Sequence, residues 1–284
     1  MLYQKAQKED NAPQVVKSLI YRIKYTSQLE EDGMVKAIDN TRQEIDKADF
    51  PEKPLLQSML GQLYQAYLDN NYWSFRNRTN TPGFQSEDIR TWSVEQLIQA
   101  SNEQYLASVR HDQLKEVPIG SLEAILQESR NSEGLRPTLY DLIIHRAIDH
   151  FSNERSYLTE PAFKFNITRE EAFAPAAQFV QATFQTRDSS SGKWVNLQLL
   201  QDLLKNHLKD ADPAVLIDAD LKRLRFVYNN ALQLPKDSLY IGALDALSGK
   251  YEKHPSASEI LYEKALTIYQ KGHLYSDQDS EKLQ

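Results

Sequence analysis

The sequence predicts an all-α fold built as a stack of helical hairpins. Glycine is scarce, with 9 among 284 residues, and residues that favour helices, such as Leu, Ala, Gln, Glu and Lys, are frequent. Apolar residues recur at helical spacing in one segment after another, and caps and prolines separate these segments. Because a single hairpin buries only one of its faces, neighbouring hairpins must stack to share a core.

The first three helices are expected before residue 73. Asn11 and Pro13 open the first, and Gly33 stands where its C-cap is expected. A second helix is expected over residues 35–45, ended by Pro51. The third has the clearest pattern, with apolar residues in pairs every four positions: Leu55, Leu56, Met59, Leu60, Leu63, Tyr64, Tyr67 and Leu68. This spacing places one apolar stripe along a helix.

Start signals predict further helices. Ser93 and Gln96 fit a capping box, in which each side chain bonds the other residue's amide. A short helix is expected over residues 121–129, and Pro137 opens the next one. Residues 168–171 fit a second capping box that leads into an apolar run.

The domain organisation is predicted from one irregular stretch. Residues 152–167 include Pro161 and several aromatic residues and lack helical periodicity. We therefore expect a first helical-hairpin stack over residues 1–152 and a second helical part over 153–284, continuous with the first as one superhelix.

The last predicted hairpin is the most informative. Apolar residues mark helices over 239–251 and 260–269, with His254 and Pro255 at the turn. Small alanines at a tight crossing, tyrosines at the ends and proline after the first helix resemble a tetratricopeptide repeat. No strict period of about 34 residues runs through the remaining chain, so we expect an irregular superhelix similar to tetratricopeptide repeats.

The composition excludes several function classes. The net charge of −7 argues against a nucleic-acid partner, which needs clustered Lys and Arg. The absence of cysteine excludes disulfides, thiolate nucleophiles and cysteine-based zinc sites. No run approaches the roughly 18 apolar residues of a membrane helix, so no membrane insertion by this segment is expected. The first residues read as the end of a helix, and we expect the natural chain to begin earlier.

No catalytic residue, cofactor or metal is predicted. None of the six histidines lies in a His-Glu-x-x-His motif. His145 and Asp149 share a helix face and could ligate a metal, but a surface ion pair or hydrogen bond is favoured because no third ligand is evident. Residues 188–193 read as a polar loop, and residues 187–194 lack the pattern of a phosphate-binding loop. The carboxylates of residues 30–32 are interpreted as solvated rather than as an acid–base pair.

One segment is a candidate partner-binding loop. Residues 70–79 combine aromatic, arginine and amide side chains, and Trp73, Phe75, Arg76 and Arg78 are the candidate contact residues. The favoured alternative is an ordered structural loop, in which Arg76 or Arg78 bonds carbonyl groups and Trp73 fills the core.

Four motifs, in the same order, resemble the helical N-terminal region of bacterial alpha-2-macroglobulin-like proteins of the Bacteroidetes type. They are Asn11-Ala12-Pro13-Gln14 with Lys17-Ser18-Leu19-Ile20-Tyr21-Arg22, Arg76-Asn77-Arg78-Thr79, Asp88-Ile89-Arg90-Thr91-Trp92, and Arg136-Pro137-Thr138-Leu139-Tyr140-Asp141. The resemblance covers most of the first 180 residues, and the later part matches more loosely.

The resemblance implies a non-enzymatic helical segment with a structural or partner-binding role. Members of this family are long envelope proteins, periplasmic, outer-membrane-anchored or extracellular, that continue into β-sandwich modules and act as endopeptidase inhibitors. Some trap their target protease through a thioester, which cannot lie here because the chain has no cysteine. Two alternatives stay open: a free-standing tetratricopeptide-like adaptor that binds a peptide in its groove, and an enzyme whose site is assembled from distant residues.

Overall fold

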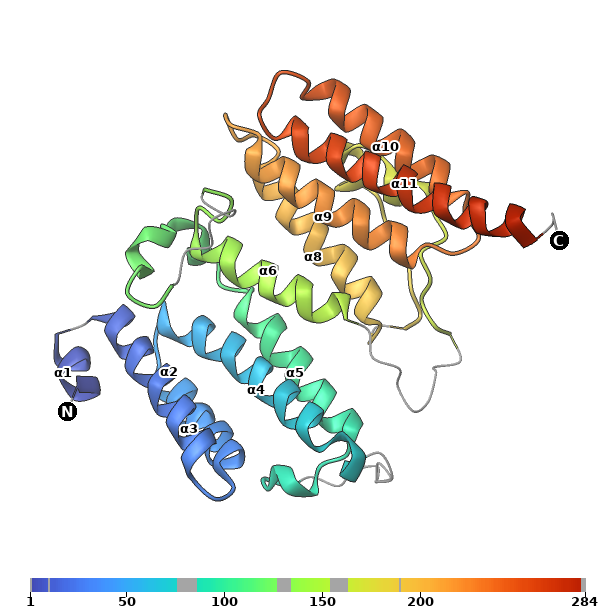
Figure 1. Ribbon diagram of the computed structural model, residues 1–284. Helices are drawn as coiled ribbons and strands as arrows, with labels where there is room; N and C mark the ends of the chain where they lie inside the picture. The colour runs from blue at the N-terminus through green and yellow to red at the C-terminus, as the bar shows by residue number, and fades with distance from the viewer. Residues whose placement is uncertain are drawn as a thin grey trace. The chain divides into compact units, whose positions relative to one another are not determined.

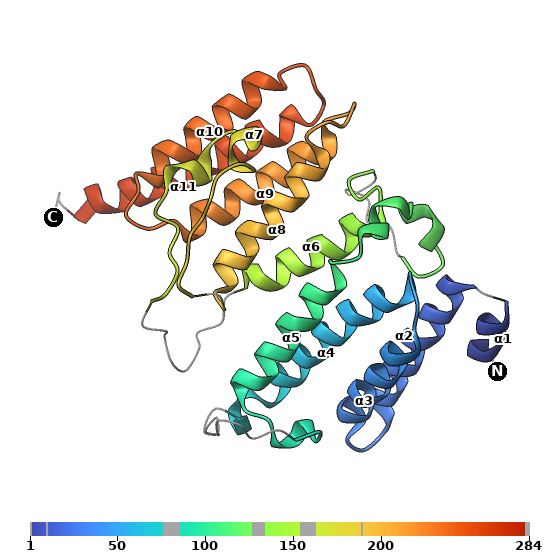
Figure 2. The same ribbon diagram turned by 180° about the vertical axis from the view of Figure 1, so that it is seen from behind.

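The computed structural model confirms the all-α prediction (Figure 1 and, from behind, Figure 2). It describes residues 2–9, 11–75, 86–126, 134–153, 163–188 and 190–281. Within these ranges the chain forms eleven α-helices and four short 3-10 helices, and no strand. Two compact units, Met1–Glu160 and Pro161–Gln284, are described separately below.

The first unit is a series of sequentially packed helices. Its elements are α1 (Leu2–Lys8), α2 (Ala12–Leu29), α3 (Gly33–Lys47), α4 (Glu52–Phe75), η1 (Ile89–Thr91), α5 (Val94–Ser108), η2 (Asp112–Glu116), η3 (Ile119–Leu122) and α6 (Leu139–Ser152). Each helix from α1 to α5 packs against the next in the chain, and α6 packs on both α4 and α5. The predicted caps at Asn11 and at Ser93 with Gln96 are both present.

The turn between α2 and α3 corrects one prediction. Gly33 is not the C-cap of α2 but the first residue of α3, and Asp32 takes the left-handed conformation with φ of 56°. A Cβ atom on Gly33 would lie 2.1 Å from the carbonyl oxygen of Thr26. Glycine is therefore required by the close approach of the two helices rather than by a helix-ending conformation.

Helices α4 and α5 of the first unit pack closely around Gly61. The Ser101 hydroxyl on α5 donates to the Gly61 carbonyl oxygen on α4 at 2.7 Å, in a buried position. A Cβ atom on Gly61 would lie 2.7 Å from the Tyr105 ring. The missing side chain at Gly61 therefore lets Tyr105 lie flat against α4.

We expect Gly61→Ala to destabilise the first unit by about 1–3 kcal/mol, because overpacking outweighs the roughly 1 kcal/mol that alanine gains in a helix. Urea unfolding followed by circular dichroism measures this change. Gly242→Ala is the matched control, because a Cβ there meets nothing within 4 Å. A stabilised Gly61→Ala variant would contradict the prediction.

The segment before α6 also differs from the prediction. The helix expected over 121–129 is replaced, in its described part, by the 3-10 turn η3 and a further turn. The Ile119 amide donates to the Pro137 carbonyl, and the Leu139 amide to the Val117 carbonyl, both at 2.9 Å. These pairings hold residues 117–119 in an extended bridge against residues 137–139, directly before the segment where the helix was expected.

The second unit contains four long helices. Its elements are η4 (Glu170–Phe173), α7 (Ala176–Phe179), α8 (Gly192–His207), α9 (Ala214–Asn230), α10 (Lys236–Lys250) and α11 (Ala257–Glu281). From α8 to α11, each helix packs against the next. The predicted turn between α10 and α11 is present at His254 and Pro255.

Two helix starts in the second unit were predicted wrongly. The expected capping box at 168–171 is absent, since the Glu171 carboxylate accepts from the Arg169 guanidinium, with Nε 3.2 Å away, and the segment forms only short turns. The polar loop assigned to 188–193 ends earlier, because the Ser191 side chain caps α8 by accepting from the Trp194 amide at 3.3 Å.

The predicted boundary at residues 152/153 follows the end of α6 directly and falls inside the first unit. The continuity of the two parts as one superhelix and its tetratricopeptide-like character stay predictions.

Candidate functional site

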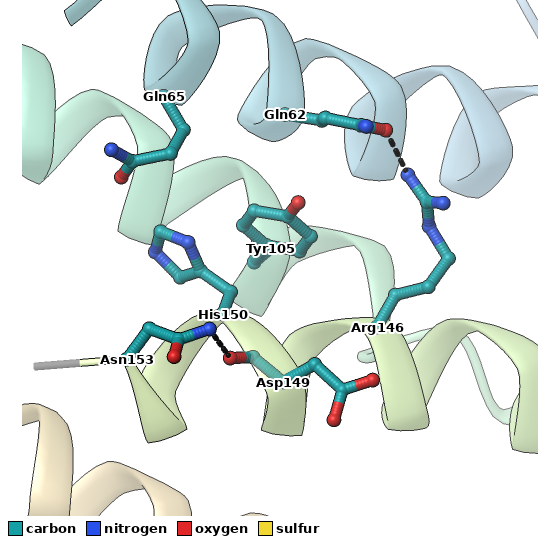
Figure 3. Close-up of a pocket in the computed structure, with 7 residues that line it drawn as sticks. All are labelled: Gln62, Gln65, Tyr105, Arg146, Asp149, His150 and Asn153. Atoms are coloured by element: carbon teal, nitrogen blue, oxygen red, sulfur yellow. Dashed lines mark hydrogen bonds between the residues drawn. The ribbon is translucent and has the colours of Figure 1, made fainter. Parts of the chain in front are cut away.

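A polar pocket of about 690 Å³ lies between α4, α5 and α6 of the first unit (Figure 3). Its lining residues are Gln62, Gln65, Tyr105, Arg146, Asp149, His150 and Asn153. Of these, only Asp149 is among the candidate residues from the sequence. The available signal is the spacing of residues 146, 149, 150 and 153, which places polar side chains near one another along α6 and at its C-cap.

Helix α6 positions the pocket because its start is fixed by a capping box and most of its apolar side chains are buried. The Thr138 amide donates to Asp141 Oδ2 at 3.0 Å, and the Asp141 amide donates back to the Thr138 hydroxyl. Ile143, Ala147 and Ile148 are fully buried. The polar face of α6 is thereby turned toward the space beside α4 and α5.

Arg146 reaches from α6 to α4 (Figure 3). Its Nε donates to the Ser58 hydroxyl at 2.8 Å, and its Nη2 donates to Gln62 Oε1 at 2.8 Å. Both acceptors are neutral, and no carboxylate in the described ranges lies within ion-pair distance of Arg146. Its Nη1 has no hydrogen-bond partner among the described residues, so the outer edge of the guanidinium keeps open donors.

His150 is a neutral acceptor in the pocket. Its Nε2 lies 2.7 Å from Asn102 Oδ1, and because an amide oxygen only accepts, Nε2 carries the proton and Nδ1 keeps its lone pair. Burial lowers the pKa of His150 to about 4, so the ring is uncharged at neutral pH. Figure 3 shows the ring pointing from α6 toward α4, beside Tyr105 and below Gln65.

Tyr105 forms the floor beside His150. The two rings stack with centroids 4.3 Å apart and planes inclined by 22°. Burial raises the pKa of the Tyr105 hydroxyl, with a smaller lowering by the charge of Arg146 and a raising by that of Asp149. The hydroxyl therefore stays protonated at neutral pH and remains a donor.

Two of the lining amide side chains are held by local bonds. Gln65 Nε2 donates to Asp69 at 2.9 Å, and Asn153 Nδ2 donates to the Asp149 carbonyl at 3.0 Å. Donors on Arg146 and Tyr105 thus face acceptors on His150 and Gln65 within one pocket. This combination suits the binding of a polar ligand that carries both an anionic group and an N–H donor.

The predicted partner-binding loop is only partly described. Helix α4 continues to Phe75, so Trp73 and Phe75 lie at its end, whereas Arg76 and Arg78 lie outside the described residues. The expectation that Trp73 fills the core is wrong, because Trp73 is 76% exposed and Phe75 is 2% exposed. Phe75 continues the buried stripe of α4 by packing on Tyr67, with ring centroids 5.5 Å apart.

The two candidate metal ligands differ in their exposure to solvent. His145 is buried, while Asp149 is exposed and lines the pocket. Across the described ranges, no cluster of three or more His, Cys, Asp or Glu side chains is arranged to hold a metal ion.

Within the part of the chain that the structure describes, no helix has the length and apolar character needed to span a membrane. No protein-family model, curated protein or solved structure matches this chain.

Proposed function

We propose that this chain is a non-enzymatic helical segment of an alpha-2-macroglobulin-like envelope protein that traps proteases. Its role there is to support the protein's architecture or to bind a partner, in the periplasm, at the outer membrane or outside the cell. Four ordered motifs support this role. Their described polar side chains form helix caps and contacts between elements.

The first motif holds the first hairpin together. Asn11 caps α2 by accepting from the Gln14 amide at 3.2 Å. Arg22 on α2 forms an ion pair with Glu44 on α3 at 2.9 Å. The Tyr3 hydroxyl donates to the same carboxylate, so one motif arginine belongs to a contact between three helices.

The later motifs have the same character. Asp88 caps η1 by accepting from the Arg90 amide at 3.0 Å, and Arg90 reaches Asp32 at 3.1 Å. The Arg42 guanidinium lies over the Trp92 ring, 4.9 Å from the ring centroid. With the Thr138 capping box of α6, these motif residues form caps and contacts between elements, as expected of a scaffold.

The nucleotide sequence on both sides of this coding region tests the proposal. We expect a signal peptide upstream and a long β-rich chain downstream. In the complete protein, removal of this segment is expected to alter protease trapping, whereas the purified segment alone neither cleaves nor inhibits proteases. A gene that encodes these residues alone would contradict the proposal.

The second candidate function, a free-standing adaptor that binds a peptide, is favoured by one surface. Helix α11 exposes Leu261, Tyr262, Ile268 and Tyr269, each by more than half. Their spacing places them on one face of the helix. A peptide array that yields no binding to the purified chain would count against this candidate.

A further inference from the structure

We propose that the pocket between α4, α5 and α6 binds the carboxyl-terminal end of a peptide, with Arg146 holding the α-carboxylate and His150 Nδ1 accepting the preceding amide N–H. This site is an addition to the scaffold role. It stands on the geometry of the pocket, whichever candidate function holds.

Arg146 bonds neutral acceptors, whereas three other arginines of the first unit form ion pairs. Arg22 pairs with Glu44, Arg42 with Asp39 and Arg90 with Asp88. Arg146 is instead held by the neutral oxygens of Ser58 and Gln62. These bonds occupy one edge of the guanidinium and orient it, while the edge formed by Nη1 and Nη2 can still take a carboxylate in a two-point contact.

A carboxylate in the pocket limits the charge that the ligand can carry. Asp149 lies three residues from Arg146 on the same helix and lines the same pocket. Its carboxylate opposes a second negative charge on the ligand, which favours a singly charged carboxylate over a doubly charged phosphate. Tyr105 lines the same pocket, and its protonated hydroxyl is a further donor for the bound carboxylate.

His150 offers a hydrogen-bond acceptor beside the Arg146 guanidinium. His150 Nδ1 faces no donor among the described residues, and Arg146 and His150 are four positions apart on α6. Side chains at this spacing have Cβ atoms about 5–6 Å apart. A ligand that satisfies both needs an anion and an N–H donor close together, which is the arrangement at the end of a peptide chain.

The volume of the pocket indicates the size of the ligand. A volume of about 690 Å³ is within the range of about 300–1,000 Å³ typical of pockets for larger organic ligands. The same carboxylate and N–H chemistry occurs in an N-acylated amino acid, which would leave most of this space unfilled. The pocket therefore fits several residues of a peptide better.

The test compares two probes on the unaltered chain: acetyl-trialanine with a free carboxylate, and the same peptide with a carboxyl-terminal amide. Binding is followed by nuclear magnetic resonance titration, including the imidazole nitrogens of His150. We expect the free acid to bind at least about tenfold more tightly than the amide, since the amide loses the charge-assisted contact. A change at Nδ1 of His150 is expected only with the free acid.

Variants then assign the contact. Arg146→Gln is expected to weaken binding of the free acid by about tenfold or more, while Arg110→Gln, an exposed arginine outside the pocket, leaves it unchanged. His150→Phe keeps an aromatic ring next to Tyr105 and is expected to weaken binding by removing the acceptor. Thermal unfolding checks that each variant is folded, and the acid–amide comparison stands without any variant.

Four outcomes would overturn the proposal: no binding of the free acid, equal binding of acid and amide, equal binding of N-acetylalanine and the tripeptide, or tighter binding of inorganic phosphate. The third would assign the site to a small molecule, and the fourth to a phosphate group. None of these outcomes bears on the gene context that tests the proposed function.

Discussion

Arg223→Met is expected to lower the free energy of unfolding of the second unit by about 3–5 kcal/mol. Arg223 on α9 is 1% exposed, and its Nε and Nη2 lie 2.8 and 2.7 Å from Asp220 Oδ1. Its Nη1 donates to the Ala172 carbonyl at 2.6 Å, and the guanidinium lies 4.7 Å from the centre of the Phe179 ring. Without it, the buried charge of Asp220 would have no counter-ion among the described residues.

Two controls make this expectation specific. Arg225→Met, on the same helix, removes an ion pair in which Arg225 is 42% exposed, and Glu263 keeps the hydrogen bond from Tyr240. This change is expected to cost about 1 kcal/mol or less. The double variant Asp220→Leu, Arg223→Met removes both buried charges and is expected to lose less stability than Arg223→Met alone. Urea unfolding measures all three. A loss below about 1 kcal/mol for Arg223→Met would show that Asp220 is rehydrated or neutralised at little cost.

The second large effect is a dependence of stability on pH that comes from His150. The pKa of the folded state is lowered to about 4 by burial, and the ordinary value is about 6.5. Between these values the unfolded chain binds a proton that the folded chain does not. The contribution of neutral His150 to the free energy of unfolding is therefore fully present above about pH 6.5 and is lost as the pH falls toward 4. The loss is about 2–3 kcal/mol once partial exposure of the ring is allowed for.

His150→Phe tests this contribution. Urea unfolding of both proteins at pH 7 and at pH 4.5 provides the comparison, because carboxylates that titrate in this range affect both alike. We expect the natural chain to lose about 2 kcal/mol more than the variant over this interval. Equal losses would mean that the pKa of His150 in the folded state is close to its ordinary value. The variant also removes the bond to Asn102, so its stability at pH 7 is the reference.

Most of the fold could be predicted because its signals are local. The Ser93 capping box involves residues three positions apart, and the stripe of α4 follows from helical spacing alone. Predictions failed where a contact outside the expected cap decided the local structure. Gly33 is required by the Thr26 carbonyl rather than by a helix end, and Glu171 bonds the Arg169 side chain instead of the cap amide.

The pocket could not be predicted, because its chemistry depends on contacts between distant residues. The Arg146 side chain reads as an ordinary surface cation, and the structure brings it to Ser58, 88 positions away, instead of to a carboxylate. His150 acquires its neutral state from burial against Tyr105 and its tautomer from Asn102, 48 positions away. Helical period and capping chemistry are encoded by neighbouring residues, whereas burial, charge pairing and proton position arise only when helices pack.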